Sequence, residues 1–96
     1  MTIWIERTIA NEDVPRLQDT FAKQWEAFGS PRGMLLVSVN DIVSGMSRVI
    51  AGFPNDVMVH LYEGFTPIDD GELPKEATFL VGHDADFKER FSIPTN

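Results

Sequence analysis

A helical repeat in the first third of the sequence constrains the fold more than any other feature. Large apolar residues recur there at spacings of three and four positions: Val14, Leu17, Phe21, Trp25 and Phe28. Side chains at this spacing lie on one stripe of an α-helix, so the repeat predicts a helix running to about Phe28 with one buried face. We expect Asn11 to cap its first turn. The segment 29–33 holds two glycines and a proline, and we expect it to end the helix.

Four other segments have the composition of β-strands. Residues 2–9 are rich in Ile, Trp and Thr, which favour a strand. Residues 34–39 are almost continuously apolar, as is typical of a central strand covered on both faces. Residues 56–63 alternate in the manner of a strand with two different faces, and residues 78–82 complete the set.

The segment 41–53 has two interpretations. Its apolar residues follow a helical spacing and predict a second helix: Ile42, Val43, Met46, Val49, Ile50 and Phe53. Gly45 and the β-branched residues are poor helix formers, however. The alternative is therefore a β-hairpin that turns near Asn40 and Asp41.

The last third of the sequence contains a long loop and a short helix. Residues 64–75 (GFTPIDDGELPK) have turn chemistry throughout and are longer than a minimal hairpin connection. The segment from Asp84 to Phe91 predicts a short helix that Asp84 caps, with Phe87 and Phe91 packing one turn apart.

Together these elements predict one α+β domain that spans residues 1–96. The order strand, helix, strand, helix, strand, strand, with the short C-terminal helix, places two helices on a single small mixed sheet of about four strands. A chain of 96 residues has room for one core. Its 43% hydrophobic residues are enough for it to fold by itself.

Two family resemblances are visible at this level. The order of elements resembles that of thioredoxin-like domains, and a strand followed by residues 11–17 (NEDVPRL) is similar to the start of many acyl-CoA-dependent N-acetyltransferases. The Cys-x-x-Cys motif of the first family and the glycine-rich pyrophosphate loop of the second are absent. Neither resemblance therefore carries an activity over to this chain.

Several classes of protein are excluded by composition. The sequence has no cysteine, which removes disulfides, thiolate metal sites and cysteine nucleophiles. Its beginning lacks the pattern of a signal peptide, and no apolar run approaches the roughly 18 residues of a transmembrane helix. We expect a cytoplasmic protein without membrane contact and without a cofactor.

The distribution of charge indicates the kind of partner. Fifteen acidic residues against eight basic ones give a net charge of −7, and from Asp56 onward nine acids face only three bases. Nucleic-acid binding needs clustered Lys and Arg, so it is disfavoured, and a protein with a basic surface is the expected partner. The expected contact residues lie on and after the long loop: Asp69, Asp70, Glu72 and Glu76.

Two histidines are the candidates for chemistry. His83, Asp84 and Asp86 could ligate a divalent metal, although a helix start in which Asp84 is the cap explains the same residues. His60 is a candidate catalytic base on the strand 56–63, and a hydrogen-bonded structural histidine is the alternative. If the last two strands pair as a hairpin, His60 approaches His83 and one site results.

These observations favour a small acidic protein-binding module over an enzyme. It would act on a basic partner as an inhibitor, an immunity-type protein or an accessory protein. The sequence has no nucleophile elbow and no phosphate-binding loop, so we lean against catalysis. The alternatives are a small enzyme or a metal- or ligand-binding domain that uses the His60 and His83 region, and a homodimer that buries an exposed sheet face.

Overall fold

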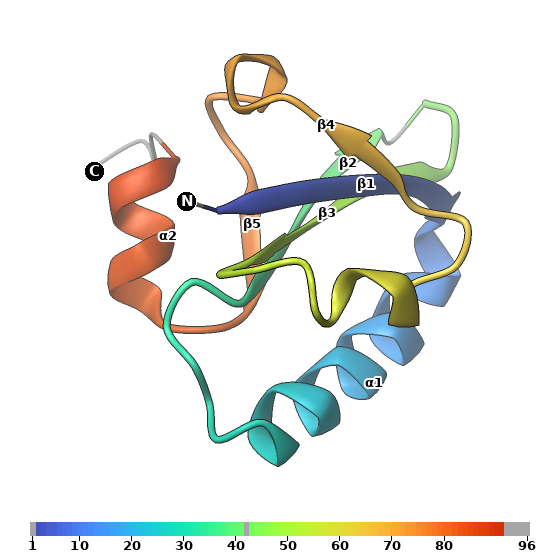
Figure 1. Ribbon diagram of the computed structural model, residues 1–96. Helices are drawn as coiled ribbons and strands as arrows, with labels where there is room; N and C mark the ends of the chain where they lie inside the picture. Colours follow the sequence, from blue (N-terminus) through green and yellow to red (C-terminus); the bar gives the residue numbers. More distant parts are fainter. Residues whose placement is uncertain (1, 42, 92–96) are drawn as a thin grey trace.

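The computed structural model describes residues 2–41 and 43–91, which form one sheet with two α-helices (Figure 1). The elements follow in this order: β1 (Ile3–Ala10), α1 (Val14–Ala27), β2 (Leu35–Asp41), β3 (Met46–Phe53), β4 (Thr66–Ile68), β5 (Thr78–Val81) and α2 (Asp84–Arg90). Short 3-10 helices occupy Asn11–Asp13, Val59–Leu61 and Asp70–Glu72. Among these described residues, neither α1 nor α2 has the length and apolar character needed to cross a membrane.

The five strands form a single antiparallel sheet in the order β4-β1-β3-β2-β5. β1 pairs with β3 along its whole length, and β2 lies between β3 and β5. The α+β class with two helices on one small sheet is thus confirmed. The sheet has one strand more than the four expected, and it is antiparallel throughout rather than mixed.

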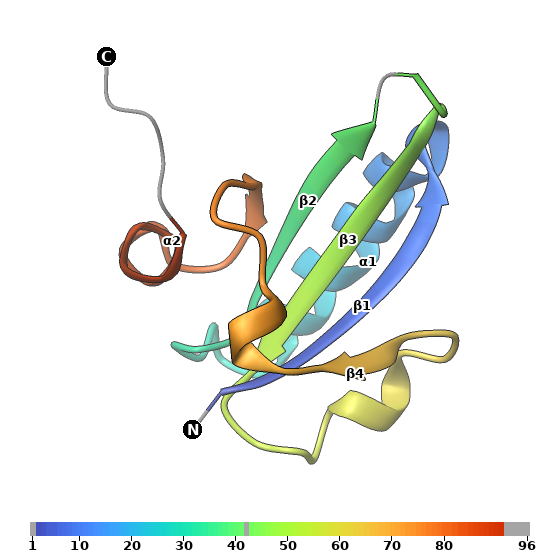
Figure 2. The same cartoon turned by 90° about the horizontal axis from the view of Figure 1, so that it is seen from above.

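The two helices pack against side chains from opposite faces of the sheet. Figure 2 shows α1 behind the strands and α2 to one side of them. Side chains alternate along a strand, so Ile5 packs on the face under α1 and Trp4 on the face under α2. Phe21 is the fully buried residue at the centre of the α1 stripe. The first helix is therefore as the sequence predicts, but Phe28 at the end of its apolar stripe is 49% exposed rather than buried. Residues 35–38 are buried, as expected of a central strand.

The second helix expected over 41–53 is absent, and the hairpin alternative is correct. β2 ends at Asp41 and β3 begins at Met46, so the turn lies just after the expected position. The Asp41 Oδ1 atom accepts hydrogen bonds from the backbone N–H groups of Val43 (3.0 Å) and Ser44 (3.3 Å). Gly45 has a φ of +73°, which a helix does not allow. Because β2 continues into β3 rather than a helix, the thioredoxin-like order of elements does not hold.

The strand predicted over 56–63 is also wrong. Asn55 Oδ1 accepts a hydrogen bond from the Val57 N–H at 3.0 Å, and the 3-10 helix Val59–Leu61 follows. Met58 and Tyr62 are buried, while Val57 is 64% exposed. In a strand Met58, His60 and Tyr62 would share one face, but His60 is exposed while the other two are buried, so the burial suits a turn rather than a strand. The strand β4 forms instead inside the segment expected to be a loop.

Asn11 does not cap the first helix. α1 starts at Val14 after Asp13, without a side-chain hydrogen bond at its cap. The Asn11 side chain instead accepts a hydrogen bond from the Ser47 hydroxyl of β3. Ser47 is fully buried, so this bond satisfies a polar group inside the fold and joins the start of α1 to the sheet.

Candidate partner-binding surface

Most of the basic residues are already neutralised by neighbours in the fold. Within residues 2–41 and 43–91, six ion pairs each join one acidic side chain to one basic side chain. Nine acids remain against Arg7 and Lys75, and this excess accounts for the whole net charge of −7. The nine are all exposed: Glu12, Glu26, Asp41, Asp56, Glu63, Asp69, Glu72, Glu76 and Glu89.

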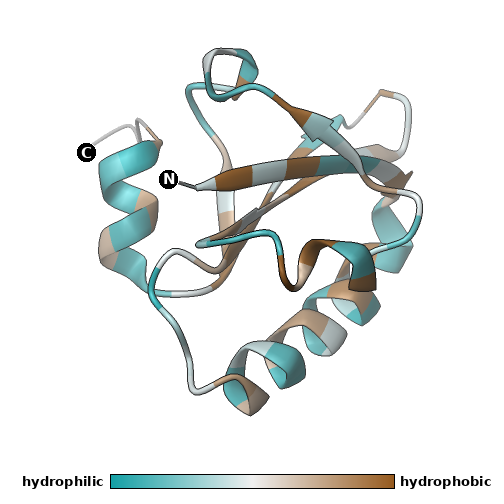
Figure 3. Ribbon diagram, viewed as in Figure 1, coloured by the Kyte–Doolittle hydropathy of each residue, from teal (hydrophilic) through white to brown (hydrophobic). Residues whose placement is uncertain are grey.

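Three of these uncompensated acids lie on the connection between β4 and β5. We call Asp69, Glu72 and Glu76 the acidic loop; all three side chains are exposed. Figure 3 shows this connection in mostly hydrophilic colours above the sheet. Its one basic residue is Lys75, so the loop presents a net negative surface.

Asp70, the fourth predicted contact residue, has a different role. Its Oδ1 atom accepts a hydrogen bond from Trp4 Nε1 at 3.1 Å, and its carboxylate pairs with Arg90 of α2. The Arg90 guanidinium also donates to the Asp70 backbone carbonyl at 2.8 Å and lies over the Trp4 ring, 5.7 Å from its centroid. Asp70 therefore ties the loop to β1 and α2 and is not available to a partner in the same way as its neighbours.

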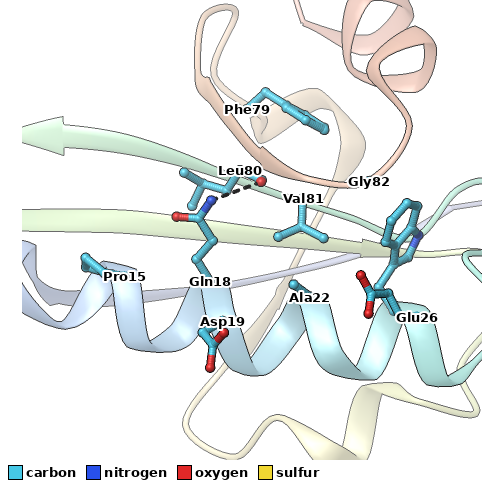
Figure 4. A pocket seen from close by; sticks show the side chains of 10 residues that line it. Pro15, Gln18, Asp19, Ala22, Glu26, Phe79, Leu80, Val81 and Gly82 are labelled. Carbon is cyan, nitrogen blue, oxygen red and sulfur yellow. Dashed lines mark hydrogen bonds between the residues drawn. The ribbon is translucent and has the colours of Figure 1, made fainter.

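A groove opens between α1 and β5 (Figure 4). It has a volume of about 470 Å³, and Gln18, Ala22 and Trp25 of α1 line one side. Residues 79–82 line the other side. The Gln18 side chain donates a hydrogen bond across the groove to the backbone carbonyl of Leu80 at 3.2 Å.

The predicted metal ligands each contact a different neighbour. The His83 Nε2 atom lies 2.9 Å from the Ser30 carbonyl oxygen, and its ring packs edge-on against Trp25. Asp84 pairs with Lys88. Asp86 pairs with Arg32 and accepts the Gly33 N–H at 3.2 Å.

The helix start at these residues also differs in detail from the expectation. α2 begins at Asp84, so His83 rather than Asp84 is the residue at the cap. Asp84 and Asp86 lie in the first turn of α2, where a negative charge suits the helix dipole. Across the described residues, no group of three or more His, Asp or Glu side chains converges to hold a metal ion.

His60 and His83 are not joined by strand pairing. His60 is exposed on the 3-10 helix Val59–Leu61, and β5 pairs with β2 rather than with residues 56–63. The hairpin that would bring the two histidines together therefore does not form. The strand pairing thus gives the candidate residues His60 and His83 no common site.

Tyr62, the neighbour of His60, is a core residue. Its ring packs among Phe21, Phe53 and Phe65, and its hydroxyl donates a hydrogen bond to Gln24. Burial raises the pKa of Tyr62 to about 12, because the charged phenolate would lose its hydration. The phenol is thus neutral at physiological pH and stabilises the contact between α1 and the segment after β3.

Comparison with known proteins adds no relative. The chain matches no protein-family model, no curated protein and no solved structure. The geometry above therefore carries the functional argument.

Sequence reasoning missed three residues that shape this surface. Arg90 and Trp4 hold the acidic loop in place, and Gln18 bridges the groove. Each makes its contact with a residue at least 20 positions away. A single sequence contains no local signal for such contacts. The position of Gln18, a polar residue beside Leu17 of the apolar stripe, is the one hint that its side chain is half-buried.

Proposed function

We propose that this chain is a protein-binding module that acts on a partner with a basic surface, as an inhibitor, an immunity-type protein or an accessory protein. The observation that supports the proposal is the set of nine exposed acids that have no ion pair with another described residue, three of them within the acidic loop. Such a surface raises the rate of encounter with a positively charged protein and selects against negatively charged ones.

The contacts that attach the acidic loop to β1 and α2 favour a role of the loop in binding a basic partner. Asp70 connects the loop to Trp4 and Arg90, so its neighbours Asp69 and Glu72 stand on a segment that is attached to β1 and α2. A surface that is already ordered loses less conformational entropy on binding than a flexible tail does. Charge and order together suit electrostatic docking.

The test compares three baits in affinity capture from the lysate of the native host, at low salt and at 0.5 M NaCl. The first bait is the unchanged protein. The second carries Asp69→Asn, Glu72→Gln and Glu76→Gln, and the third carries Asp56→Asn, Glu63→Gln and Glu89→Gln. The last two lose the same charge from exposed acids outside ion pairs, so they differ only in position.

We expect a stoichiometric basic protein on the first and third baits at low salt, weakened at high salt and lost from the second bait. With that protein purified, neutralising the acidic loop should reduce its association rate about tenfold at low salt. Equal capture by all three baits, or capture that salt does not weaken, would contradict the proposal.

A further inference from the structure

The strand β5 is an open edge of the sheet. It stands last in the strand order and pairs with β2 on one side only. The other edge strand, β4, has three residues and contains Pro67, which lacks the N–H that a further strand would use. β5 contains no proline and has four residues. Within the described chain, it is therefore the edge better suited to accept another strand.

The groove described above runs along this edge. The helix α1 forms one wall, and β5 with Gly82 forms the other (Figure 4). Leu80 lies at an irregularity in the pairing of β5 with β2 and has no partner residue there, and its carbonyl accepts the Gln18 amide instead. A backbone acceptor of the edge strand thus binds a hydrogen-bond donor at the groove rather than on β2, and the backbone of a bound segment could donate to it in place of Gln18.

The charge around the groove selects its occupant. Two acids of α1 line it: Glu26, which is outside the ion pairs, and Asp19, which pairs with Lys23; no basic residue is among the residues that line it. Glu76 of the acidic loop stands two residues before the start of β5. A second copy of this chain would bring the same acids to the contact and would be repelled. A segment with Lys or Arg side chains is complementary.

We propose that β5 binds an extended, basic segment of another protein as an added β-strand in the groove between α1 and β5. The four residues of β5 span about 13 Å, so four to five residues of the partner would pair with it. Backbone hydrogen bonds would supply affinity, and a basic side chain near Glu26, or one that displaces Lys23 from Asp19, would supply selectivity. This inference rests on the proposed function and names the form in which the partner binds.

The experiment uses a library of random twelve-residue peptides displayed on phage, selected against the full chain. We expect enriched peptides to carry Lys or Arg among β-branched residues, without a central proline. Binding of a synthetic winner should shift the amide resonances of residues 78–82 and of the groove side of α1. It should also slow hydrogen exchange in β5.

Charge-reversal variants complete the test. Asp19→Lys with Glu26→Lys should weaken the winning peptide by about tenfold or more, since two attractive contacts become repulsive. Asp56→Lys with Glu63→Lys changes the net charge equally at exposed positions outside the groove, and it should alter affinity less than about twofold. Asp19 also pairs with Lys23, so Glu26→Lys alone serves as a variant that leaves this pair intact.

Each contrary result identifies what has failed. Peptides that shift only residues 69–76 would overturn the added strand while leaving the acidic loop as the binding surface. Peptides without basic residues, or equal losses in both variants, would overturn the charge argument. A dimer in sedimentation experiments with β5 protected from exchange would assign the edge to a second copy and overturn the proposal.

Discussion

At the scale of single residues, Trp4 connects three parts of the molecule. Its indole N–H binds Asp70, its ring lies under Arg90, and Phe91 packs edge-on against it at 5.8 Å between centroids. The ring also lies over Gly52 of β3, where an added Cβ would approach Trp4 Cζ3 to 2.7 Å. The sequence predicts a strand over residues 2–9, but the polar partners of Trp4 are 66 and more positions away and could not be predicted.

Substitutions of Asp70 and Asp69 should differ in their effect on stability, although the two residues are neighbours and both acidic. Asp70→Ala removes the acceptor of Trp4 and the partner of Arg90, and we expect it to lower the free energy of unfolding by about 1–2 kcal/mol. Asp69→Ala should change it by less than about 0.5 kcal/mol, since Asp69 is exposed and outside the ion pairs. Urea denaturation measures both, and equal losses would refute the distinct role of Asp70.

The stability of the fold should depend on pH in the alkaline range because of Tyr62. Its pKa is about 12 in the folded state against about 10 for an exposed tyrosine, so the unfolded chain releases the phenolic proton first. The stabilisation is complete below pH 10 and should be lost as the pH rises from 10 to 12. Tyr62 is the single tyrosine, so absorbance at 295 nm follows its titration directly.

A Tyr62→Phe variant is the control for this dependence. It should be less stable at pH 7 by about 1 kcal/mol, because the hydrogen bond to Gln24 is lost. Between pH 10 and 12 the gap should narrow, since phenylalanine has no proton to release. A constant gap across this range would show that Tyr62 titrates alike in both states.

At the scale of elements, the sequence predicts α1, β1, β2, β5 and α2 but assigns the middle of the chain incorrectly. The correct assignments rest on burial patterns that the element shows by itself, such as the stripe through Phe21. In the segment 41–53, apolar residues follow both a helical and an alternating pattern because β3 is buried on both faces. The turn formed by Asp41 and Gly45 selects the hairpin. A prediction that considers only the spacing of apolar residues does not take this turn into account.

The turn between β2 and β3 therefore depends on Gly45. Gly45→Ala should lower the free energy of unfolding by about 1 kcal/mol, because its φ of +73° is unfavourable for a residue with a Cβ. Gly71→Ala is the matched control, since a Cβ there also meets nothing within 4 Å but φ is not positive. Thermal melts of both variants measure the difference, and similar values would argue against strain at Gly45.

At the scale of the whole molecule, the unpaired acids have two opposite effects: they would attract a basic partner, and they lower the stability of the fold because they repel one another. Among the residues that the structure describes, six ion pairs neutralise six of the eight basic side chains. The remaining acids repel one another across a fold whose radius of gyration is 12.6 Å. The sequence predicts the net charge and the acidic C-terminal half, but it does not show which acids are paired. Asp70 and Asp86 look equivalent to Glu72 in sequence and differ from it only through distant arginines.

Repulsion among the unpaired acids should make stability depend on salt. Raising NaCl from 20 mM to 0.5 M should increase the melting temperature by about 5 °C, the equivalent of roughly 1 kcal/mol. The variant with Asp69→Asn, Glu72→Gln and Glu76→Gln should melt higher at low salt and respond less to NaCl. A melting temperature that falls with salt would mean that the six ion pairs outweigh the repulsion.

The strand pairing also sets an order for the assembly of the chain during its synthesis. β2 and β3 are neighbours in sequence and can pair as soon as both have left the ribosome, whereas β1 must wait for β3 and then for β4. Trp4 is made 66 residues before Asp70, and Arg90 and Phe91 follow later still. Gly52 of β3 can pack against its ring early, but the indole N–H has no acceptor and the ring lacks its contacts with Arg90 and Phe91 until those residues have been made.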